Sequence, residues 1–214
     1  MDLFDFNQNT KTNAPLADRM RPRNIDEFIG QSEILGKGTL LYKLIKEGNV
    51  PSIILYGPPG VGKTSIATII AKDGHSDFFK LNAVSSGVAE AKEVIAKAKD
   101  NLRIYGRRTY LLLDECHRWS KSQSDCILQA VEEGIITFIG STTENPYVSI
   151  TRALLSRCKV FKFKRLDFKE MKIAIDRALK DKEIGFGKLS INIDDEAVDA
   201  LINIANGDLR KLYN

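Results

Sequence analysis

The residues best suited to chemistry form one glycine-rich segment that ends in a lysine and a threonine. The segment obeys G-x-x-x-x-G-K-[ST], a pattern in which backbone N–H groups wrap around a phosphate. Its predicted phosphate-binding residues are Gly57, Pro58, Pro59, Gly60, Val61, Gly62, Lys63, Thr64 and Ser65. Glycines let the backbone turn inward, and the N-terminus of a following helix adds the positive end of its dipole. We expect Lys63 to reach the β- and γ-phosphates and the Thr64 hydroxyl to bind Mg²⁺; an ordinary glycine-rich turn is the alternative.

Two adjacent carboxylates, Asp114 and Glu115, follow the apolar run Tyr110 to Leu113. Such a run is typical of a strand that is covered on both faces, and ligands gather at the carboxyl ends of parallel strands. Neighbouring carboxylates are costly unless a cation or a proton is close. We expect Asp114 to complete the Mg²⁺ shell and Glu115 to polarise an attacking water. The alternative is a strand that ends in acidic surface residues. For His117 we expect a structural or coupling role rather than that of a base.

The elements that must position these residues alternate between strand and helix. We expect strands at 52–56, 78–82, 110–113, 135–140 and 159–163, and helices at 38–47, 65–72, 88–100, 122–133 and 151–156. This alternation predicts a parallel α/β sheet with right-handed crossovers. From Asp167 only helices are expected, over 167–182, over 194–205 and from 207 onward. We therefore expect a flexible tail (1–14), a nucleotide-binding domain (15–164) and a helical lid domain (165–214) that is incomplete at its C-terminus.

Composition narrows the class without identifying it. The chain has 214 residues and a formal net charge of +4, which is too mild to prove a nucleic-acid partner. No apolar segment is long enough to cross a membrane and we find no signal peptide, so we expect a cytoplasmic protein. Three cysteines without metal-ligand spacing are expected to be reduced thiols. Six basic residues cluster between 152 and 165, which indicates either a solvated basic strand or a phosphate-facing surface: Arg152, Arg157, Lys159, Lys162, Lys164 and Arg165.

Several further motifs accompany the phosphate loop and the acidic pair. They are Pro15 to Pro22, Ser86 to Val88, Gly106 to Thr109, Asp114 to Arg118, Lys121 to Gln123, Ile136 to Pro146 and Ala153 to Arg157. Together they resemble the AAA+ ATPases of the clamp-loader clade, and within it the replication-associated recombination protein A family. The phosphate loop alone is generic, whereas the Thr-Thr-Glu-Asn-Pro run with Leu-Leu-Ser-Arg is specific. The resemblance covers the chain from about residue 15 and implies an αβα sandwich with a parallel five-stranded sheet.

The resemblance also implies roles for individual residues in binding the nucleotide. The residues that match the adenine-pocket segment of such ATPases are Met20, Arg21, Pro22, Ile29 and Gly30. Asn82 matches the polar residue that restrains the catalytic glutamate until DNA is bound, and the competing account is an asparagine that satisfies local backbone. Arg210 matches the sensor 2 arginine of the lid.

Two further positions match residues that act on the γ-phosphate. Thr143 matches sensor 1, with Thr142 and Asn145 as alternatives. Arg157 matches the arginine finger, which would act in a neighbouring subunit's site, where a guanidinium offsets charge developing on the transferred phosphoryl group. Read without its context, Arg157 is a basic surface residue.

The function implied by the resemblance is a DNA-dependent ATPase in replication-fork maintenance, recombination and repair, with ATP and Mg²⁺ as cofactors. Implied partners are single-stranded, forked or gapped DNA, single-strand DNA-binding protein and further copies of the full-length protein, in a nucleoid-associated location. One alternative is an ATP-binding switch or clamp-loader-like subunit, although Glu115, Thr143 and Arg157 are all present; another is a Holliday-junction branch-migration motor. The start of the tail, residues 1–6, resembles sliding-clamp-binding peptides, or else its hydrophobic residues pack on the protein's own surface.

Overall fold

The computed structural model describes residues 14–74 and 76–214, which form two compact units. The sheet unit comprises Gln31–Pro58 and Lys63–Lys164, and the helical unit comprises the residues up to Gly30 together with Pro59–Gly62 and Arg165–Asn214. The predicted clamp-binding residues 1–6 lie outside the described residues. Within the described ranges, no helix is long and apolar enough to span a membrane.

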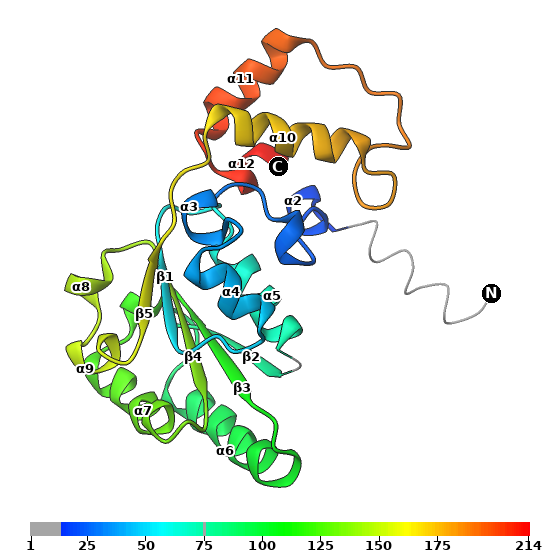
Figure 1. Cartoon of the computed structure of the whole chain (residues 1–214). Helices are drawn as coiled ribbons and strands as arrows, with labels where there is room; N and C mark the ends of the chain where they lie inside the picture. Colours follow the sequence, from blue (N-terminus) through cyan, green and yellow to red (C-terminus); the bar gives the residue numbers. More distant parts are fainter. Residues whose placement is uncertain (1–13, 75) are drawn as a thin grey trace. The chain divides into compact units, whose positions relative to one another are not determined.

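The sheet unit is built on one parallel five-stranded sheet, which confirms the fold class expected from the sequence (Figure 1). Its strands are β1 (Ile53–Tyr56), β2 (Asp77–Asn82), β3 (Thr109–Asp114), β4 (Thr137–Thr142) and β5 (Lys159–Lys162). They lie in the order β2-β3-β4-β1-β5, so β4 separates the strand before the phosphate loop from the strand that ends in carboxylates. The carboxyl ends of all three therefore meet at one edge of the sheet.

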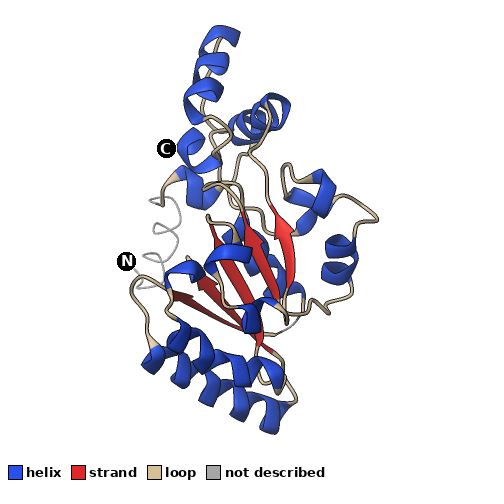
Figure 2. Cartoon of the chain, turned by 90° about the vertical axis from the view of Figure 1, so that its left-hand side faces the viewer, coloured by secondary structure: helices blue, strands red, loops and turns tan. Residues whose placement is uncertain are grey.

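Helices flank the strands of this unit, as the secondary-structure colours of Figure 2 show. They are α3 (Ser32–Leu35), α4 (Leu40–Lys46), α5 (Lys63–Asp73), α6 (Val88–Tyr105), α7 (Lys121–Glu132), α8 (Pro146–Ser149) and α9 (Arg152–Leu155), with the 3₁₀ turn η2 (Cys116–Arg118). Helices α6 and α7 lie side by side, and α5 contacts β2, β3 and β4. Ser120 begins α7 with a reciprocal capping box to Gln123.

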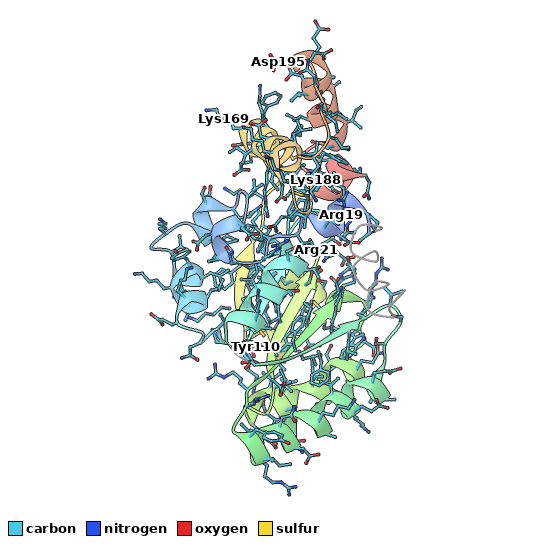
Figure 3. The ribbon with its side chains drawn as sticks, turned by 90° about the vertical axis from the view of Figure 1, so that its right-hand side faces the viewer. Arg19, Arg21, Tyr110, Lys169, Lys188 and Asp195 are labelled. Atoms are coloured by element: carbon cyan, nitrogen blue, oxygen red, sulfur yellow. The ribbon has the colours of Figure 1, made fainter. Side chains whose placement is uncertain are left out.

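Both faces of the central strands are buried, which explains why β3 reads as an uninterrupted apolar run. Leu111 and Leu113 belong to the apolar cluster that includes Val94 of α6 and Ile127 of α7. Tyr110 points to the opposite face because side chains alternate along a strand, and it is 0% exposed. Its hydroxyl donates to the Val50 carbonyl at 3.1 Å (Tyr110 is labelled in Figure 3). A strand buried on both faces has no place for alternating polar residues.

The helical unit contains α2 (Leu16–Arg19), the 3₁₀ turn η1 (Ile25–Glu27), α10 (Phe168–Lys180), α11 (Asp195–Ala205) and α12 (Leu209–Tyr213). Aspartates at the N-caps begin the last three helices, since Asp167, Asp194 and Asp208 each accept backbone N–H bonds from the first turn. Arg177 of α10 joins the start of this unit to its end: its guanidinium donates to the Glu27 carboxylate at 2.8 Å and to the Glu27 carbonyl at 3.0 Å.

Candidate nucleotide-binding site

The glycine-rich loop adopts a backbone path that side chains would block. Gly57 follows β1 with φ of 151°, and a Cβ there would lie 2.3 Å from the Phe163 carbonyl oxygen. Gly62 precedes α5 with φ of 96°, and a Cβ there would lie 2.4 Å from the Phe28 ring. Only glycine fits these two positions. The loop is followed directly by the N-terminus of α5, an arrangement that favours the binding of an anion.

Lys63 follows this loop and is the first residue of α5. Its side chain is 8% exposed, and its Nζ donates to the carbonyls of Gly57 at 2.8 Å and Pro58 at 2.7 Å. These bonds place a buried ammonium group on the loop whose N–H groups would face a phosphate. That Lys63 binds the β- and γ-phosphates stays a prediction.

The next residue, Thr64, meets the acidic end of β3. Its Oγ1 lies 3.4 Å from Asp114 Oδ2, and Lys80 Nζ of β2 lies 3.8 Å from the same carboxylate oxygen. A hydroxyl beside a carboxylate is a donor set suited to Mg²⁺, which keeps several waters and phosphate oxygens of its own. In the described part of the chain, no group of three or more histidine, cysteine, aspartate or glutamate side chains could hold a metal by itself. The residues present fit an ion that arrives with a nucleotide.

Glu115, directly after β3, has an unusual backbone conformation. Its φ of 53° and ψ of 40° lie in the left-handed region, which costs free energy for a residue with a Cβ, and such strain collects at functional sites. The turn η2 that it begins is anchored by Trp119, whose buried indole donates to the Ser86 carbonyl at 3.1 Å. The Glu115 carboxylate is 36% exposed at the edge of the sheet where water can reach it.

His117 is buried beside Glu115, with its side chain only 4% exposed. Its Nδ1 lies 2.8 Å from Thr142 Oγ1 and 3.4 Å from Glu115 Oε2, and its Nε2 lies 3.5 Å from Glu144 Oε1. The sequence pattern favoured a structural or coupling role for His117 but gave no sign of these partners. They come together because β3 and β4 are adjacent, which the order of elements along the chain does not reveal.

The three sensor 1 candidates have different surroundings. Thr142 is fully buried at the end of β4, and its hydroxyl contacts His117 and accepts from the Glu144 N–H at 3.0 Å. Asn145 is the N-cap of α8 and accepts from the Tyr147 N–H at 3.1 Å. Thr143 is exposed just past the strand. Thr142 and Asn145 thus have local partners, and Thr143 stays our prediction for the sensor.

Asn82 ends β2 opposite Asp114 in the parallel register. Its side-chain oxygen accepts from the Val84 N–H at 2.9 Å, the local backbone contact that competes with a restraining role toward Glu115. The restraining role stays a prediction.

Arg157 lies just after α9 and contacts its own subunit. Its guanidinium forms an ion pair with Glu132 at the end of α7 and donates to the Ala153 carbonyl at 2.7 Å and to Ser156 Oγ at 3.0 Å. The side chain is 39% exposed, so the surrounding solvent weakens the pair. The guanidinium is partly exposed, and the role of arginine finger in a neighbouring subunit stays a prediction.

The other basic residues of this stretch are also exposed, and some have partners nearby. Lys164 pairs with Glu33 at 2.6 Å, and Arg165 donates to the Asn206 carbonyl at 2.6 Å. These contacts are those of a solvated basic surface, and they leave the choice between that surface and a phosphate-facing one open.

The remaining predicted residues belong to the helical unit, which also contains Pro59–Gly62 of the phosphate loop. Phe28 contacts Gly62, and the Leu209 N–H at the start of α12 donates to the Gly60 carbonyl at 3.1 Å. Met20 is 3% exposed at the end of α2, and Arg210 is exposed in the first turn of α12. The other four predicted adenine-pocket residues, Arg21, Pro22, Ile29 and Gly30, belong to the same unit. Arg21 Nε donates to Asp18 at 2.9 Å (Arg19 and Arg21 are labelled in Figure 3).

The three cysteines are free thiols and take no part in this site. Burial raises the pKa of Cys158 to about 12 and moves the pKa of Cys116 upward as well. Since the thiolate is the nucleophile and the metal ligand, both groups are inert near neutral pH.

Comparisons with known proteins show which proteins this chain resembles. A family profile described as the Holliday junction DNA helicase RuvB P-loop domain matches residues 20–155. Replication-associated recombination protein A of Escherichia coli (strain K12) is 44% identical over 211 residues, which is 99% of this chain and 46% of that protein. ATPase WRNIP1 of Dictyostelium discoideum is 43% identical over 99% of this chain and 24% of that protein. The solved Thermotoga maritima RuvB, titled a Holliday junction branch migration motor, matches with a TM-score of 0.72 and 26% identity over 91% of this chain and 63% of that one. The chain thus spans less than half the length of these two curated relatives.

Proposed function

Since this chain belongs to the AAA+ P-loop ATPases of the RuvB type, and matches the N-terminal ATPase portion of the replication-associated recombination protein A family, we propose that it binds ATP with Mg²⁺ and hydrolyses ATP to ADP and phosphate during replication-fork maintenance, recombination and repair. The observation that carries the proposal is the meeting of Thr64 with Asp114, 3.4 Å apart, beside the strained Glu115. A phosphate loop, a magnesium donor set and a carboxylate for water then share one edge of the sheet.

The chain's own residues divide the work. Bound ATP supplies the transferable phosphoryl group, and Mg²⁺ neutralises charge on its oxygens. The loop N–H groups and Lys63 bind the phosphates, Thr64 and Asp114 hold the ion, and Glu115 orients the attacking water and accepts its proton. Thr143 contacts the γ-phosphate or that water, and Arg157 of a neighbouring subunit completes the site.

The wider role and the domain boundaries belong to the same proposal. We assign residues 15–164 to the nucleotide-binding domain and 165–214 to the start of the lid. The partners are single-stranded, forked or gapped DNA, single-strand DNA-binding protein and further copies of the full-length protein, in the nucleoid of the cytoplasm. The sliding clamp is a further candidate partner through residues 1–6, with a tail that binds nothing as its alternative.

A branch-migration motor is the second candidate function, because the solved RuvB structure carries that activity in its title and the matched profile is named for a Holliday junction DNA helicase. An ATP-binding switch without hydrolysis is a third candidate, against which the presence of Glu115, Thr143 and Arg157 argues.

Steady-state ATPase assays of the full-length protein test the proposal. Single-stranded, forked, gapped and four-way-junction DNA are added in turn, with blunt duplex as the control. We expect turnover that forked or gapped DNA raises above the duplex level. Movement of the four-way junction would favour the motor. Tight ATP binding without turnover on any of these DNAs would leave the switch as the function.

A further inference from the structure

One buried group close to the proposed site has no part in the mechanism described above. The imidazole of His117 lies between the end of β3 and the end of β4, and its side chain is 4% exposed. Each of its nitrogens faces an oxygen: Thr142 Oγ1 and Glu115 Oε2 lie near Nδ1, and Glu144 Oε1 lies near Nε2. A buried imidazole among polar groups fixes their positions through its hydrogen bonds.

The two contacts at Nδ1 compete with each other. A neutral imidazole has one N–H, so Nδ1 either donates its proton or accepts one. If Nδ1 accepts the Thr142 hydroxyl proton, the N–H lies on Nε2 and donates to Glu144. If Nδ1 carries the proton, it can donate to the Glu115 carboxylate, 3.4 Å away in this structure, or to Thr142, 2.8 Å away. The hydrogen bond that Nδ1 forms, to Thr142 or to Glu115, therefore decides whether the imidazole restrains the Glu115 carboxylate.

Thr142 links this choice to the phosphate loop. Its carbonyl accepts the N–H of Gly57, the first residue of the loop, at 3.1 Å, and its hydroxyl meets His117. One residue thus contacts the loop through its backbone and the imidazole through its side chain. If the loop shifted when it bound phosphate, Thr142 would move. The balance between the Thr142 and Glu115 contacts at Nδ1 would then change.

We propose that His117 is a positioning residue that joins the phosphate loop, through Thr142, to the water-orienting carboxylate of Glu115. This role rests on the proposed ATPase function. The strained backbone of Glu115 supports it, because φ of 53° aims a partly exposed carboxylate that the imidazole then restrains. A purely structural histidine would need a partner for each nitrogen but no contact with Glu115.

The contacts are tested first on the nucleotide-free full-length protein by ¹⁵N NMR of labelled histidines. The 214-residue sequence has two histidines, His75 and His117, and the resonances of His117 are those that the His117→Asn spectrum lacks. We expect Thr142→Val and Glu115→Gln each to shift the Nδ1 resonance of His117. Tyr110→Phe is the matched control, since it removes a buried hydroxyl from the other face of β3 and should leave the resonance unchanged. A resonance that ignores both substitutions overturns the proposal.

Kinetics then test the positioning role. His117→Ala should lower kcat roughly ten- to hundredfold while the KM for ATP and the nucleotide Kd stay within about twofold. His117→Asn, whose amide can donate in place of Nδ1, should recover part of kcat, and it also serves if the alanine variant does not fold. The double variant His117→Ala with Thr142→Val should be no worse than the more impaired single variant, because both act through one connection.

The outcomes separate this inference from the proposed function. Wild-type turnover that His117→Ala and His117→Asn leave intact overturns the positioning role alone, as do additive losses in the double variant. Equal losses of nucleotide binding and kcat indicate a structural role and overturn it as well. A wild-type protein that binds ATP without turnover overturns the ATPase and the positioning role together, even where the NMR contacts are observed.

Discussion

At the scale of the residue, the site separates nucleotide binding from hydrolysis. Lys63, at the start of α5, donates to the loop carbonyls, whereas Glu115 follows the end of β3. Either residue can therefore be substituted without moving the other. Lys63→Ala should abolish nucleotide binding, because the buried ammonium that we propose binds the phosphates is lost. Glu115→Gln should bind ATP at the wild-type Kd and turn it over at least roughly a hundredfold more slowly, since an amide cannot accept the proton of water. Nucleotide titrations beside turnover assays measure both. Wild-type hydrolysis by Glu115→Gln would remove that residue from the mechanism.

The same scale distinguishes the sensor candidates. Thr143→Ala should lower kcat at least roughly tenfold with little change in thermal stability, because Thr143 is exposed at the carboxyl end of β4. Asn145→Ala should cost about 1 kcal/mol of local stability through the lost N-cap of α8, with a smaller effect on kcat. Thermal melting and steady-state turnover of the two variants, compared side by side, check the assignment. The reverse pattern, with kcat lost only in Asn145→Ala, would transfer the sensor role to Asn145.

At the scale of the element, the sequence predicts the long elements and two short helices, α9 and α12, and misses other short ones. The five strands and the helices α4 to α7 follow from apolar periodicity, because burial on one or two faces dictates it. Helices α2, α3 and α8 have four residues each, too few to show a period. Helix α6 runs to Tyr105, beyond the predicted Asp100, and Gly106, with φ of 62°, caps it. A glycine at this position is a common helix C-cap, so the end of α6 could have been predicted from the sequence.

The site was predictable to a similar degree. Lys63, Thr64, Asp114 and Glu115 were predicted as site residues because their types and spacing form a recognisable motif. The contacts of His117 with Thr142 and of Arg157 with Glu132 were not, since they depend on strand order and on the packing of α7 beside α9. Pairings between elements distant in sequence leave no local pattern.

Helix α12 contains a tyrosine, Tyr213, that predicts a pH dependence of the free energy of unfolding. Burial raises the pKa of Tyr213 to about 12, and its hydroxyl donates to the Ala174 carbonyl of α10 at 3.1 Å. The folded state thus favours the neutral phenol, so this contribution to stability is complete below pH 10, the ordinary value, and is lost as the pH rises toward 12. Tyr213→Phe should cost about 1 kcal/mol at pH 8 through the lost hydrogen bond. Urea unfolding of both proteins at pH 8, 10 and 11 should show the wild-type advantage shrinking. A difference that is independent of pH would contradict the assignment.

At the scale of the whole molecule, Arg157 raises the question of which subunit it serves. In this chain it pairs with Glu132 of its own subunit, on an exposed surface where such a pair contributes little. A neighbour's phosphate could therefore displace Glu132 at small cost. In a ring of heterologous interfaces, each site would then take its guanidinium from the next subunit.

Mixed oligomers of the full-length protein test this arrangement. Arg157→Ala subunits keep the phosphate loop, and Lys63→Ala subunits keep the finger, so each variant alone should be inactive. Random mixing at equal amounts places an intact loop beside an intact finger at about a quarter of the interfaces, and ATPase activity should return in proportion. Mixing wild type with Lys63→Ala controls for subunit exchange. Glu132→Gln, which removes the ion pair with Arg157, should leave trans activity intact or raise it. If exchange occurs and the doubly mixed oligomer stays inactive, Arg157 does not act across the interface. Fast, concentration-independent turnover by the 214-residue chain alone would lead to the same conclusion, because a monomer would then need no neighbour's arginine.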